Sequence, residues 1–365
     1  MRNRSLWAYK ELLPVDNVSN VVSLEEGGTP LHRCSKLEEV LGLKNLYVKD
    51  ETRNPTGSFK DRPMTIAVTK AREFKANVLI SSSSGNAGVS LAAYAAKGGL
   101  NSLVFAPVNT PNTKLALIDA YGSRLVLVNG TYSDAFLLSK RASEHYGWFN
   151  ATSTFINPYQ VEGDKTVAYE IWEDMGCTVP DWIFVPISDG PLLVGCLKGF
   201  MEFNLLGYAT KLPHMVGIQP EGCAAIARAF KENSDDVKSW EKPSTVVSSL
   251  ADPLVGYSQD GTYTLKKIRE SFGVADTCTD DQTLDSVRLL ARKEGIFAEP
   301  AGAISIAGLK KLVEKGKIDS DEVVVCLVTG SGLKETNFSD AFKRPAAITP
   351  NFSEFEQLAD QILSK

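Results

Sequence analysis

Short apolar runs alternate along the chain with longer stretches in which apolar residues recur at helical spacing. The apolar runs predict strands near residues 46–49, 78–80, 103–106, 124–128, 182–186, 215–219 and 323–329. The helical spacing predicts helices near residues 89–97, 112–120, 132–145, 163–175, 192–206, 280–294 and 301–315. Strands separated by helices indicate parallel pairing through crossover connections. We therefore expect an α/β fold of mainly parallel, twisted sheets covered by helices on both faces.

Small polar residues are concentrated in four loops of this pattern. These loops span residues 54–62, 81–88, 187–192 and 329–332. In open parallel sheets, ligands bind beyond the carboxyl ends of the strands, where loops lead into helices. We therefore expect the four loops to contribute to one ligand site. Residues 231–262, in contrast, show no sustained periodicity and are expected to form the loosest region.

The loop at 54–62, NPTGSFKDR, places a lysine at the start of a helix. Ser58 and Asp61 form a Ser-x-x-Asp capping pattern, and Pro63 predicts that the regular helix begins near residues 61–63. A cationic environment at a helix N-terminus lowers the pKa of a lysine, as an amine that attacks an aldehyde requires. Lys60 is thus the candidate nucleophile. Lys165 is a second candidate, but it lacks a preceding strand and loop and is expected to form an ion pair.

Composition and net charge exclude several classes of binding partner and site. The chain has 365 residues and a net charge of −5, which argues against nucleic acid or an anionic membrane as the main partner. No apolar run approaches the roughly 20 residues that span a bilayer. The six cysteines are scattered singly and there are three histidines, so neither a disulfide framework nor a metal centre is expected. These features predict a cytoplasmic protein.

Five segments then occur in a familiar order. They are NPTGSFKDR at 54–62, SSGNAG at 83–88, NPYQVEGDKTVAYEI at 157–171, GIFAEPAGA at 295–303 and TGSGLK at 329–334. Together they resemble the threonine synthase branch of the pyridoxal-5′-phosphate enzymes, which have the tryptophan-synthase-β-like fold called fold type II. The resemblance implies a large cofactor-binding domain (1–52 and 150–345), a smaller substrate-loop domain (53–149) and a C-terminal tail helix (346–365).

The resemblance also implies roles for individual residues. Lys60 would carry the cofactor as a Schiff base and remove the α-proton of the substrate. Asn86 would hydrogen-bond the phenolic oxygen of the cofactor, and Thr329 would face its pyridine nitrogen. A threonine hydroxyl does not hold that nitrogen protonated, which favours elimination and replacement at Cβ or Cγ over transamination.

Two loops would complete this site. The cofactor phosphate would be cradled at a helix N-terminus by Ser188, Asp189, Gly190, Pro191 and Leu192. The substrate carboxylate would be held by Ser83, Ser84, Gly85, Asn86 and Ala87. Glu299 is either a buried capping carboxylate near the cofactor ring or a residue that simply starts a helix, and both interpretations remain open.

Several positions depart from the threonine synthase pattern. Pro191 offers no N–H, and Asp189 brings a negative charge close to a phosphate. Many threonine synthases bind the phosphate of their substrate through an Asn-Ser pair and an Arg. Here the matching positions are Thr154, Phe155 and Gln160, and Gln160 is the candidate substrate contact among them.

Three functions follow as hypotheses. The first is a homodimeric, pyridoxal-phosphate-dependent lyase acting on a small L-amino acid, with threonine synthase on O-phosphohomoserine as its most specific form. The second is a β-elimination or β-replacement enzyme, such as a serine/threonine ammonia-lyase or a cysteate-synthase-like enzyme, which Phe155 and Gln160 favour. The third is a non-catalytic cofactor-binding regulator, suggested by the unusual loop at 188–192.

Overall fold

The computed structural model describes residues 5–83, 85–335, 347 and 349–356. The chain divides into two units, Met1–Glu335 and Thr336–Lys365. In the second unit residues 352–356 are helical, and the rest of the predicted tail helix lies largely outside the described residues. Within the described ranges, no helix has the length and apolar character needed to cross a membrane.

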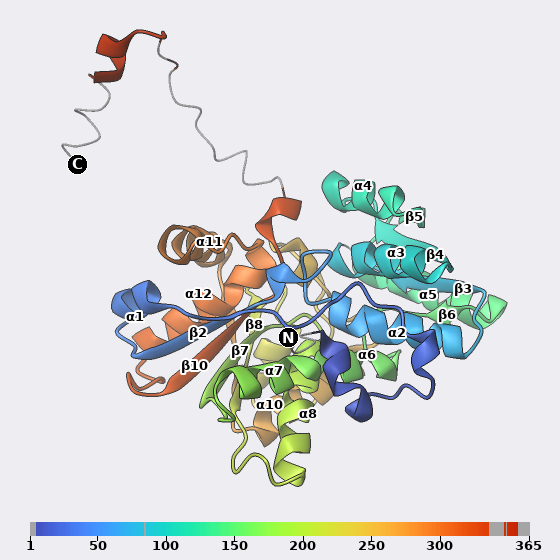
Figure 1. The fold of residues 1–365 in the computed structure, drawn as a ribbon, viewed down its shortest axis with the longest axis horizontal. Coiled ribbons are helices and arrows are strands. Elements are labelled where there is room, and N and C mark those ends of the chain that lie inside the picture. The colour runs from blue at the N-terminus through green and yellow to red at the C-terminus, as the bar shows by residue number, and fades with distance from the viewer. Residues whose placement is uncertain (1–4, 84, 336–346, 348, 357–365) are drawn as a thin grey trace. The chain divides into compact units, whose positions relative to one another are not determined.

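Two sheets form the centre of the first unit (Figure 1). The larger sheet has the strand order β1-β2-β10-β7-β8-β9, in which β1 is antiparallel to β2 and the other neighbours are parallel. Its strands are β1 (Leu31–Arg33), β2 (Asn45–Asp50), β7 (Trp182–Pro186), β8 (His214–Pro220), β9 (Val274–Cys278) and β10 (Val323–Val328). The smaller sheet is parallel throughout, in the order β5-β4-β3-β6. Its strands are β3 (Val78–Ser82), β4 (Asn101–Pro107), β5 (Arg124–Val128) and β6 (Phe149–Asn150).

The helices follow the strands along the chain. The α-helices are α1 (Ser35–Leu41), α2 (Asp61–Glu73), α3 (Asn86–Gly98), α4 (Asn112–Ala120), α5 (Tyr132–Tyr146), α6 (Pro158–Asp164), α7 (Thr166–Asp174), α8 (Pro191–Leu205), α9 (Ala225–Lys231), α10 (Ser258–Glu270), α11 (Asp280–Glu294) and α12 (Pro300–Glu314). Short 3₁₀ helices are η1 (Leu6–Leu12), η2 (Val18–Asn20), η3 (Glu51–Arg53), η4 (Ser248–Leu250) and η5 (Gly332–Lys334).

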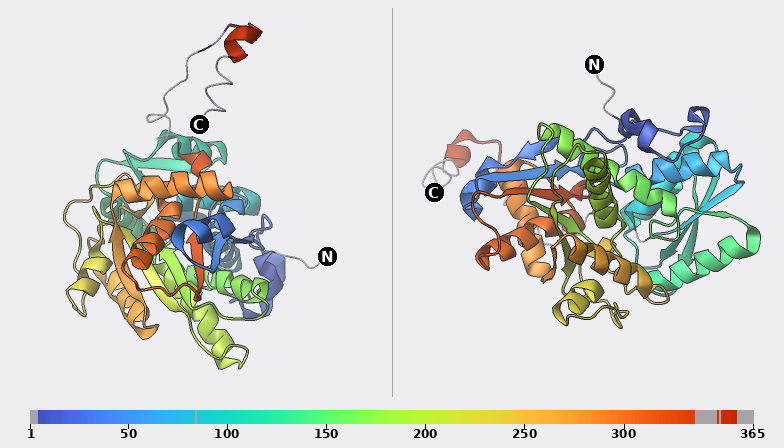
Figure 2. Two further views of the ribbon diagram at one scale, coloured as in Figure 1. Left: turned by 90° about the vertical axis from the view of Figure 1, so that its left-hand side faces the viewer. Right: turned by 90° about the horizontal axis from the view of Figure 1, so that it is seen from below.

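Helices cover both faces of the smaller sheet. Successive side chains along a strand point to opposite faces, so each strand contributes to a core on either side. Leu79 and Val104 pack into a core with the residues of α2 and α3. Their neighbours Ile80 and Phe105 pack on the other face, against Ala135 of α5. Figure 2 shows α5 and α2 on opposite sides of this sheet in its right-hand view.

The larger sheet is covered in the same way, with α11 and α12 on one side and α7, α8 and α10 on the other (Figure 1). Ile183 and Val185 of β7 belong to one buried core with Leu193 and Phe200 of α8 and Leu265 of α10. The expected α/β architecture with mainly parallel sheets is therefore confirmed.

Most of the predicted elements are present, and the differences have local causes. The short strands β1, β6 and β9 were not predicted, because none of them carries a long apolar run. The helix expected over 163–175 is interrupted at Lys165, which separates α6 from α7. Helix α10 begins at Ser258, inside the stretch expected to be loosest. The proposed domain boundaries stay predictions, since the chain up to Glu335 forms one compact unit.

A buried ion-pair network anchors α2, the helix that follows the candidate lysine. The Arg62 side chain is fully buried, and its guanidinium donates to Glu51 Oε2 at 2.7 Å and to Glu170 Oε1 at 2.6 Å. Lys49 Nζ lies 2.9 Å from the other oxygen of Glu170. Burial alone would raise the pKa of Glu170, but the Arg62 and Lys49 cations bring it down to about 2. The network thus joins β2, η3, α2 and α7.

We expect Arg62→Ala to lower the free energy of unfolding by about 3–5 kcal/mol, because Glu51 and Glu170 both lose the buried guanidinium, and Lys49 remains only for Glu170. The matched control is Arg53→Ala, which removes an exposed guanidinium 3.5 Å from Asp50, a carboxylate that keeps its bonds to Thr52, and should cost less than about 1 kcal/mol. Guanidinium chloride unfolding followed by circular dichroism measures both. Equal losses in the two variants would contradict the assigned importance of the buried network.

Candidate active site

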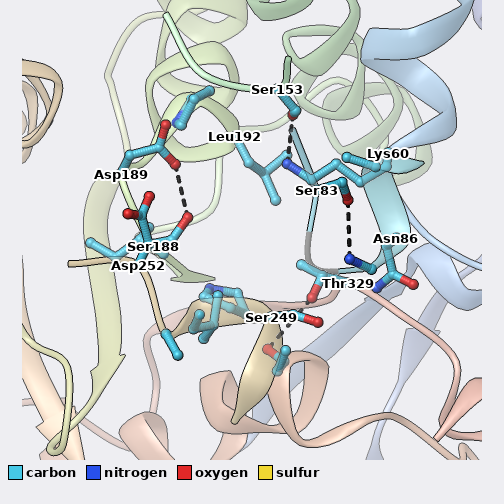
Figure 3. Close-up of a pocket in the computed structure, with 18 of the residues that line it drawn as sticks. Lys60, Ser83, Asn86, Ser153, Ser188, Asp189, Leu192, Ser249, Asp252 and Thr329 are labelled. Atoms are coloured by element: carbon cyan, nitrogen blue, oxygen red, sulfur yellow. Dashed lines mark hydrogen bonds between the residues drawn. The ribbon is translucent and has the colours of Figure 1, made fainter. Parts of the chain in front are cut away.

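The carboxyl ends of β3, β7 and β10 lead into loops that line one pocket (Figure 3). Of the residues predicted for the site, the pocket is lined by Lys60, Ser83, Gly85, Asn86, Ala87, Ser188, Asp189, Gly190, Pro191, Leu192 and Thr329. Gln160 is fully buried and is not among the lining residues. Ser84 lies outside the described residues. Four segments far apart in the sequence therefore meet as expected.

Lys60 directly precedes α2, and its Nζ donates a hydrogen bond of 2.6 Å to Ser153 Oγ. Burial lowers the pKa of Lys60, and the carboxylates of Asp164, Asp189 and Asp252 oppose that shift. The expected direction is correct, but its expected cause is not. Removal of the amine from water disfavours the ammonium form, and the charges nearby are negative rather than positive.

The predicted cap of α2 is wrong. The N-cap residue is Lys60, without a side-chain cap, and Ser58 Oγ has no partner among the described residues. The Asp61 carboxylate instead accepts hydrogen bonds from the Thr56 amide at 2.7 Å and the Thr56 hydroxyl at 2.6 Å. Ser90 Oγ donates a third bond at 2.7 Å. Asp61 is therefore directed back into the loop, where it fixes the turn before Lys60.

Backbone hydrogen bonds tie the lysine loop to the loop that follows β10. The Phe59 amide donates to Thr329 O at 3.0 Å, and the Ser331 amide donates to Gly57 O at 2.9 Å. Thr329 Oγ1 points into the pocket and lies 3.5 Å from Ala301 O (Figure 3). These bonds hold the Lys60 amine and the Thr329 hydroxyl at the same pocket, although 269 positions separate them in the chain (329 − 60).

Asn86, the first residue of α3, is oriented by a chain of charged side chains. Its Nδ2 donates to Glu299 Oε1 at 2.5 Å, and its Oδ1 has no partner among the described residues. The other oxygen of Glu299 lies 3.3 Å from Lys114 Nζ, which also contacts Glu335 at 2.8 Å. Glu299 combines parts of both interpretations: it is the N-cap residue of α12 and its carboxylate is buried at the pocket, but the side chain does not cap the helix.

The start of α8, called the cradle below, lies at the pocket. Its N-cap, Gly190, has φ +106°, and its first residue, Pro191, has no N–H to donate. The amides of Leu192 and Leu193 have no acceptor inside the helix, so they are available to a ligand, whereas the Gly190 amide is directed at the Asp189 carboxylate. A Cβ atom on Gly190 would lie 2.2 Å from Thr264 Cγ2, so only glycine fits this position.

Two side chains fix the cradle from neighbouring elements. Thr264 Oγ1 of α10 donates to Asp189 O at 2.5 Å, and Gln219 Nε2 of β8 donates to Ser188 O at 2.9 Å. Asp189 and Asp252 face this end of the pocket, and Lys60 is the one cationic side chain among its described lining residues. Within the described ranges, no group of three or more His, Cys, Asp or Glu side chains is placed to hold a metal ion.

Several further residues line the pocket. Four of them lie inside the loops and motifs of the sequence analysis but had no role assigned: Phe59, Ser82, Ile187 and Ala301. The others lie outside those segments and carry no recognisable signal in the sequence: Tyr132, Ser153, Pro186, Ser248, Ser249, Leu250, Ala251 and Asp252. Residues 248–252 belong to the stretch without periodicity, which no motif distinguishes. Tyr132 has the pattern of an ordinary helix start, and only the packing of α5 against the sheet brings it to the pocket.

We expect Gly190→Ala to destabilise the protein by about 1–3 kcal/mol more than Gly207→Ala, because its Cβ would overlap Thr264. Gly207 is a suitable control, since its φ of +79° imposes the same backbone strain but no atom lies within 4 Å of the position that an added Cβ would take. Chemical denaturation of the two variants measures the difference. Equal stability losses would show that the loop relaxes away from Thr264.

Comparisons with known proteins agree with this geometry. The family described as "Pyridoxal-phosphate dependent enzyme" matches residues 22–330. The threonine synthase of Methanocaldococcus jannaschii is 43% identical over 335 residues, covering 92% of this chain and 82% of that protein. The threonine synthase of Methanosarcina acetivorans is 39% identical over 355 residues, covering 97% and 86%.

Solved structures show the same fold at lower identity. Maize serine racemase has a TM-score of 0.72 at 21% identity, covering 86% of this chain and 91% of that chain. The processed form of threonine deaminase isoform 2 from Solanum lycopersicum has a TM-score of 0.73 at 22% identity, covering 92% of each chain.

The pocket residues fit the cofactor of this family. A desolvated amine, the second N–H of Asn86 Nδ2 and a helix N-terminus with free amides provide contacts for an aldehyde, a phenolic oxygen and a phosphate. The chain belongs to the pyridoxal-phosphate dependent enzyme family, as a threonine synthase-like lyase whose cofactor is pyridoxal 5′-phosphate.

Proposed function

We propose that the protein catalyses elimination and replacement at Cβ or Cγ of a small L-amino acid, with threonine formation from O-phosphohomoserine as its most specific activity. The observation that carries this proposal is the convergence of Lys60, Asn86, Thr329 and the start of α8 at one pocket. The similarity to threonine synthases over nearly the whole chain supports it.

In this proposal each end of the cofactor has its own protein contacts. The Lys60 amine would hold the aldehyde carbon, Asn86 the phenolic oxygen, and the amides at the start of α8 the phosphate. The Thr329 hydroxyl would face the ring nitrogen. When bound, the cofactor supplies an electron sink that stabilises negative charge at the substrate Cα. A hydroxyl partner for the ring nitrogen weakens that sink, which favours elimination and replacement.

The residues around Lys60 suit a proton-transfer role. A lowered pKa gives Lys60 Nζ a neutral fraction that accepts the α-proton of the substrate. The bond to Ser153 Oγ holds the amine in place. The substrate carboxylate would lie at the start of α3, near Ser83, Gly85 and Ala87. Ser83 Oγ already accepts from the Gly85 amide at 3.0 Å, and its hydroxyl proton is free to bond the carboxylate.

A second candidate function is β-elimination or β-replacement, as in a serine/threonine ammonia-lyase or a cysteate-synthase-like enzyme. Gln160 Nε2 donates to Ala151 O at 2.6 Å, and Gln160 does not line the pocket. Lys60 is the one cation among the described lining residues. A phosphate on the substrate would therefore lack the bidentate guanidinium contact that usually holds it.

We also propose that the enzyme is a cytoplasmic homodimer. All six cysteines are free, and five of them are buried, as is typical of proteins from a reducing compartment. The dimer follows from the family resemblance. We further propose that the two sheets are the centres of two domains, divided near residues 52 and 150, with the active site at the loops between them.

We expect the purified protein to show a visible absorbance band of bound cofactor, and Lys60→Ala to lose both this band and turnover of every amino acid. Lys165→Ala is the matched control, because Lys165 is also buried but pairs with Glu162 at 2.7 Å and Glu202 at 3.0 Å. This control should keep the band. Turnover that survives in Lys60→Ala would contradict the assigned role, and a band without any turnover in the intact protein would indicate a regulator.

We expect O-phospho-L-homoserine to yield threonine and inorganic phosphate when incubated with the cofactor-loaded enzyme. Product analysis by chromatography, in parallel with L-threonine and O-phospho-L-serine, measures the preference. Release of a 2-oxo acid from threonine, or of phosphate from O-phosphoserine alone, would instead establish the second candidate function.

A further inference from the structure

Asp189 lies where the cofactor phosphate is expected, but it has an acidic side chain. The residue is 3% exposed and lines the pocket one residue before the N-cap of α8. Its Oδ1 accepts a hydrogen bond of 2.8 Å from Ser188 Oγ (Figure 3). Its Oδ2 is buried and has no partner among the described residues. A buried, unpartnered carboxylate oxygen is costly, so the ionised form of Asp189 is disfavoured.

A second carboxyl group lies on the same wall of the pocket. Asp252 follows η4, and its Oδ1 accepts from the Leu254 amide at 3.0 Å and from the Tyr257 hydroxyl. Burial and the neighbouring Asp189 raise the pKa of Asp252 to about 7. Burial also raises the pKa of Asp189, although Lys60, the Ser188 hydroxyl and the amides of its own loop act in the opposite direction. Two adjacent buried carboxyl groups hold one proton between them near neutral pH.

The surroundings of the two groups differ. Both accept hydrogen bonds at Oδ1, and the charge of Asp189 raises the pKa of Asp252, so without a ligand the shared proton lies mainly on Asp252. A phosphate dianion at the start of α8 would lie beside the unpartnered Oδ2 of Asp189, and repulsion between the two negative charges would move the shared proton to Asp189. Its Oδ2–H then needs an acceptor, which the described residues do not offer.

Other titratable groups surround the pair. Two further carboxyl groups are Asp260 of α10 and Asp164 of α6. Burial and the charge of Asp189 raise the pKa of each. Tyr132 of α5 stays neutral, because burial and the two aspartates raise its pKa. Lys60 is the one nearby cation in the described lining, and the cofactor engages its amine.

A phosphate at the start of α8 supplies the missing acceptor. Pro191 leaves the cradle one amide short of the usual helix N-terminus. We propose that Asp189 is held as a neutral carboxylic acid whose Oδ2–H donates to the cofactor phosphate, so that cofactor binding is coupled to one proton. This inference rests on the cofactor assignment and not on the choice of substrate.

Proton coupling of this kind makes cofactor affinity depend on pH. When the pair has lost its proton, binding of the phosphate requires proton uptake, so affinity falls as pH rises. The fall approaches tenfold per pH unit once the pair is ionised. The phosphate itself does not cause this trend, because its second pKa is about 6 and it is a dianion throughout the range above neutrality.

The test measures binding of pyridoxamine 5′-phosphate to the full-length apoprotein by fluorescence, from about pH 6.5 to about pH 9. This probe keeps the phosphate but has no aldehyde to react with Lys60. We expect its dissociation constant to rise with pH in the wild type and to be nearly independent of pH in Asp189→Asn, whose amide donates at every pH. Titrations of phosphate-free pyridoxamine should show no dependence on residue 189.

Asp252→Asn provides a second, independent variant. It removes the neighbouring negative charge, so Asp189 ionises more readily and the affinity should begin to fall at lower pH. A pH-independent wild type, an Asp189→Asn protein that keeps the wild-type slope, or the same slope with pyridoxamine would each overturn the proposal. Failure of these tests leaves the Lys60 band and the product analysis unaffected, so it is distinct from failure of the proposed function.

Discussion

The hydrogen bonds between the lysine loop and the loop after β10 are the constraint on which the active site depends. The Phe59 amide bonds to Thr329 O, and the Ser331 amide bonds to Gly57 O. Each loop is itself held by a regular element, α2 on one side and β10 on the other. Backbone bonds of this kind are insensitive to side-chain identity. The positions of the Lys60 amine and of the Thr329 hydroxyl are therefore set by the fold, while side chains tune their chemistry.

The balance of charge inside the pocket is unusual for an enzyme that binds a phosphorylated cofactor. Lys60 is the one cation in the described lining, and three carboxyl groups share that lining. Glu299 is neutralised from behind by Lys114 and orients Asn86. The other two, Asp189 and Asp252, lack such a partner among the described residues, which explains why burial raises their pKa values. Neutral acids avoid repelling the phosphate and add hydrogen-bond donors.

Buried ion pairs and hydrogen bonds hold both sides of Lys60. The Arg62 network ties the helix after Lys60 to β2 and α7, and Asp61 fixes the turn before it. Ion pairs buried to this degree contribute little net stability relative to apolar packing. Removal of one partner is nevertheless strongly destabilising, because it leaves the other charge buried without compensation. We interpret the network as a device that fixes the direction of α2, and so the position of Lys60.

The sequence by itself determined the fold class and the main loops of the site. Long apolar strands and strongly periodic helices are local features, and small polar loops between them mark ligand sites in any parallel sheet. Lys60, Asn86 and Thr329 lie in such loops, within motifs that the chain shares with a known family. Short strands such as β6 escaped prediction, because their pairing energy comes from neighbours rather than from their own residues.

Only the tertiary structure decided which remaining side chains reach the pocket and in which protonation state. Asp252 lies in a stretch without periodicity, and Ser153 resembles any loop serine, so neither carried a local signal. Burial and the proximity of Asp189 to Asp252 depend on how α5, α8 and α10 pack together. Charge states of buried groups are properties of that packed environment, which is why the pattern of residues along the chain left them undetermined.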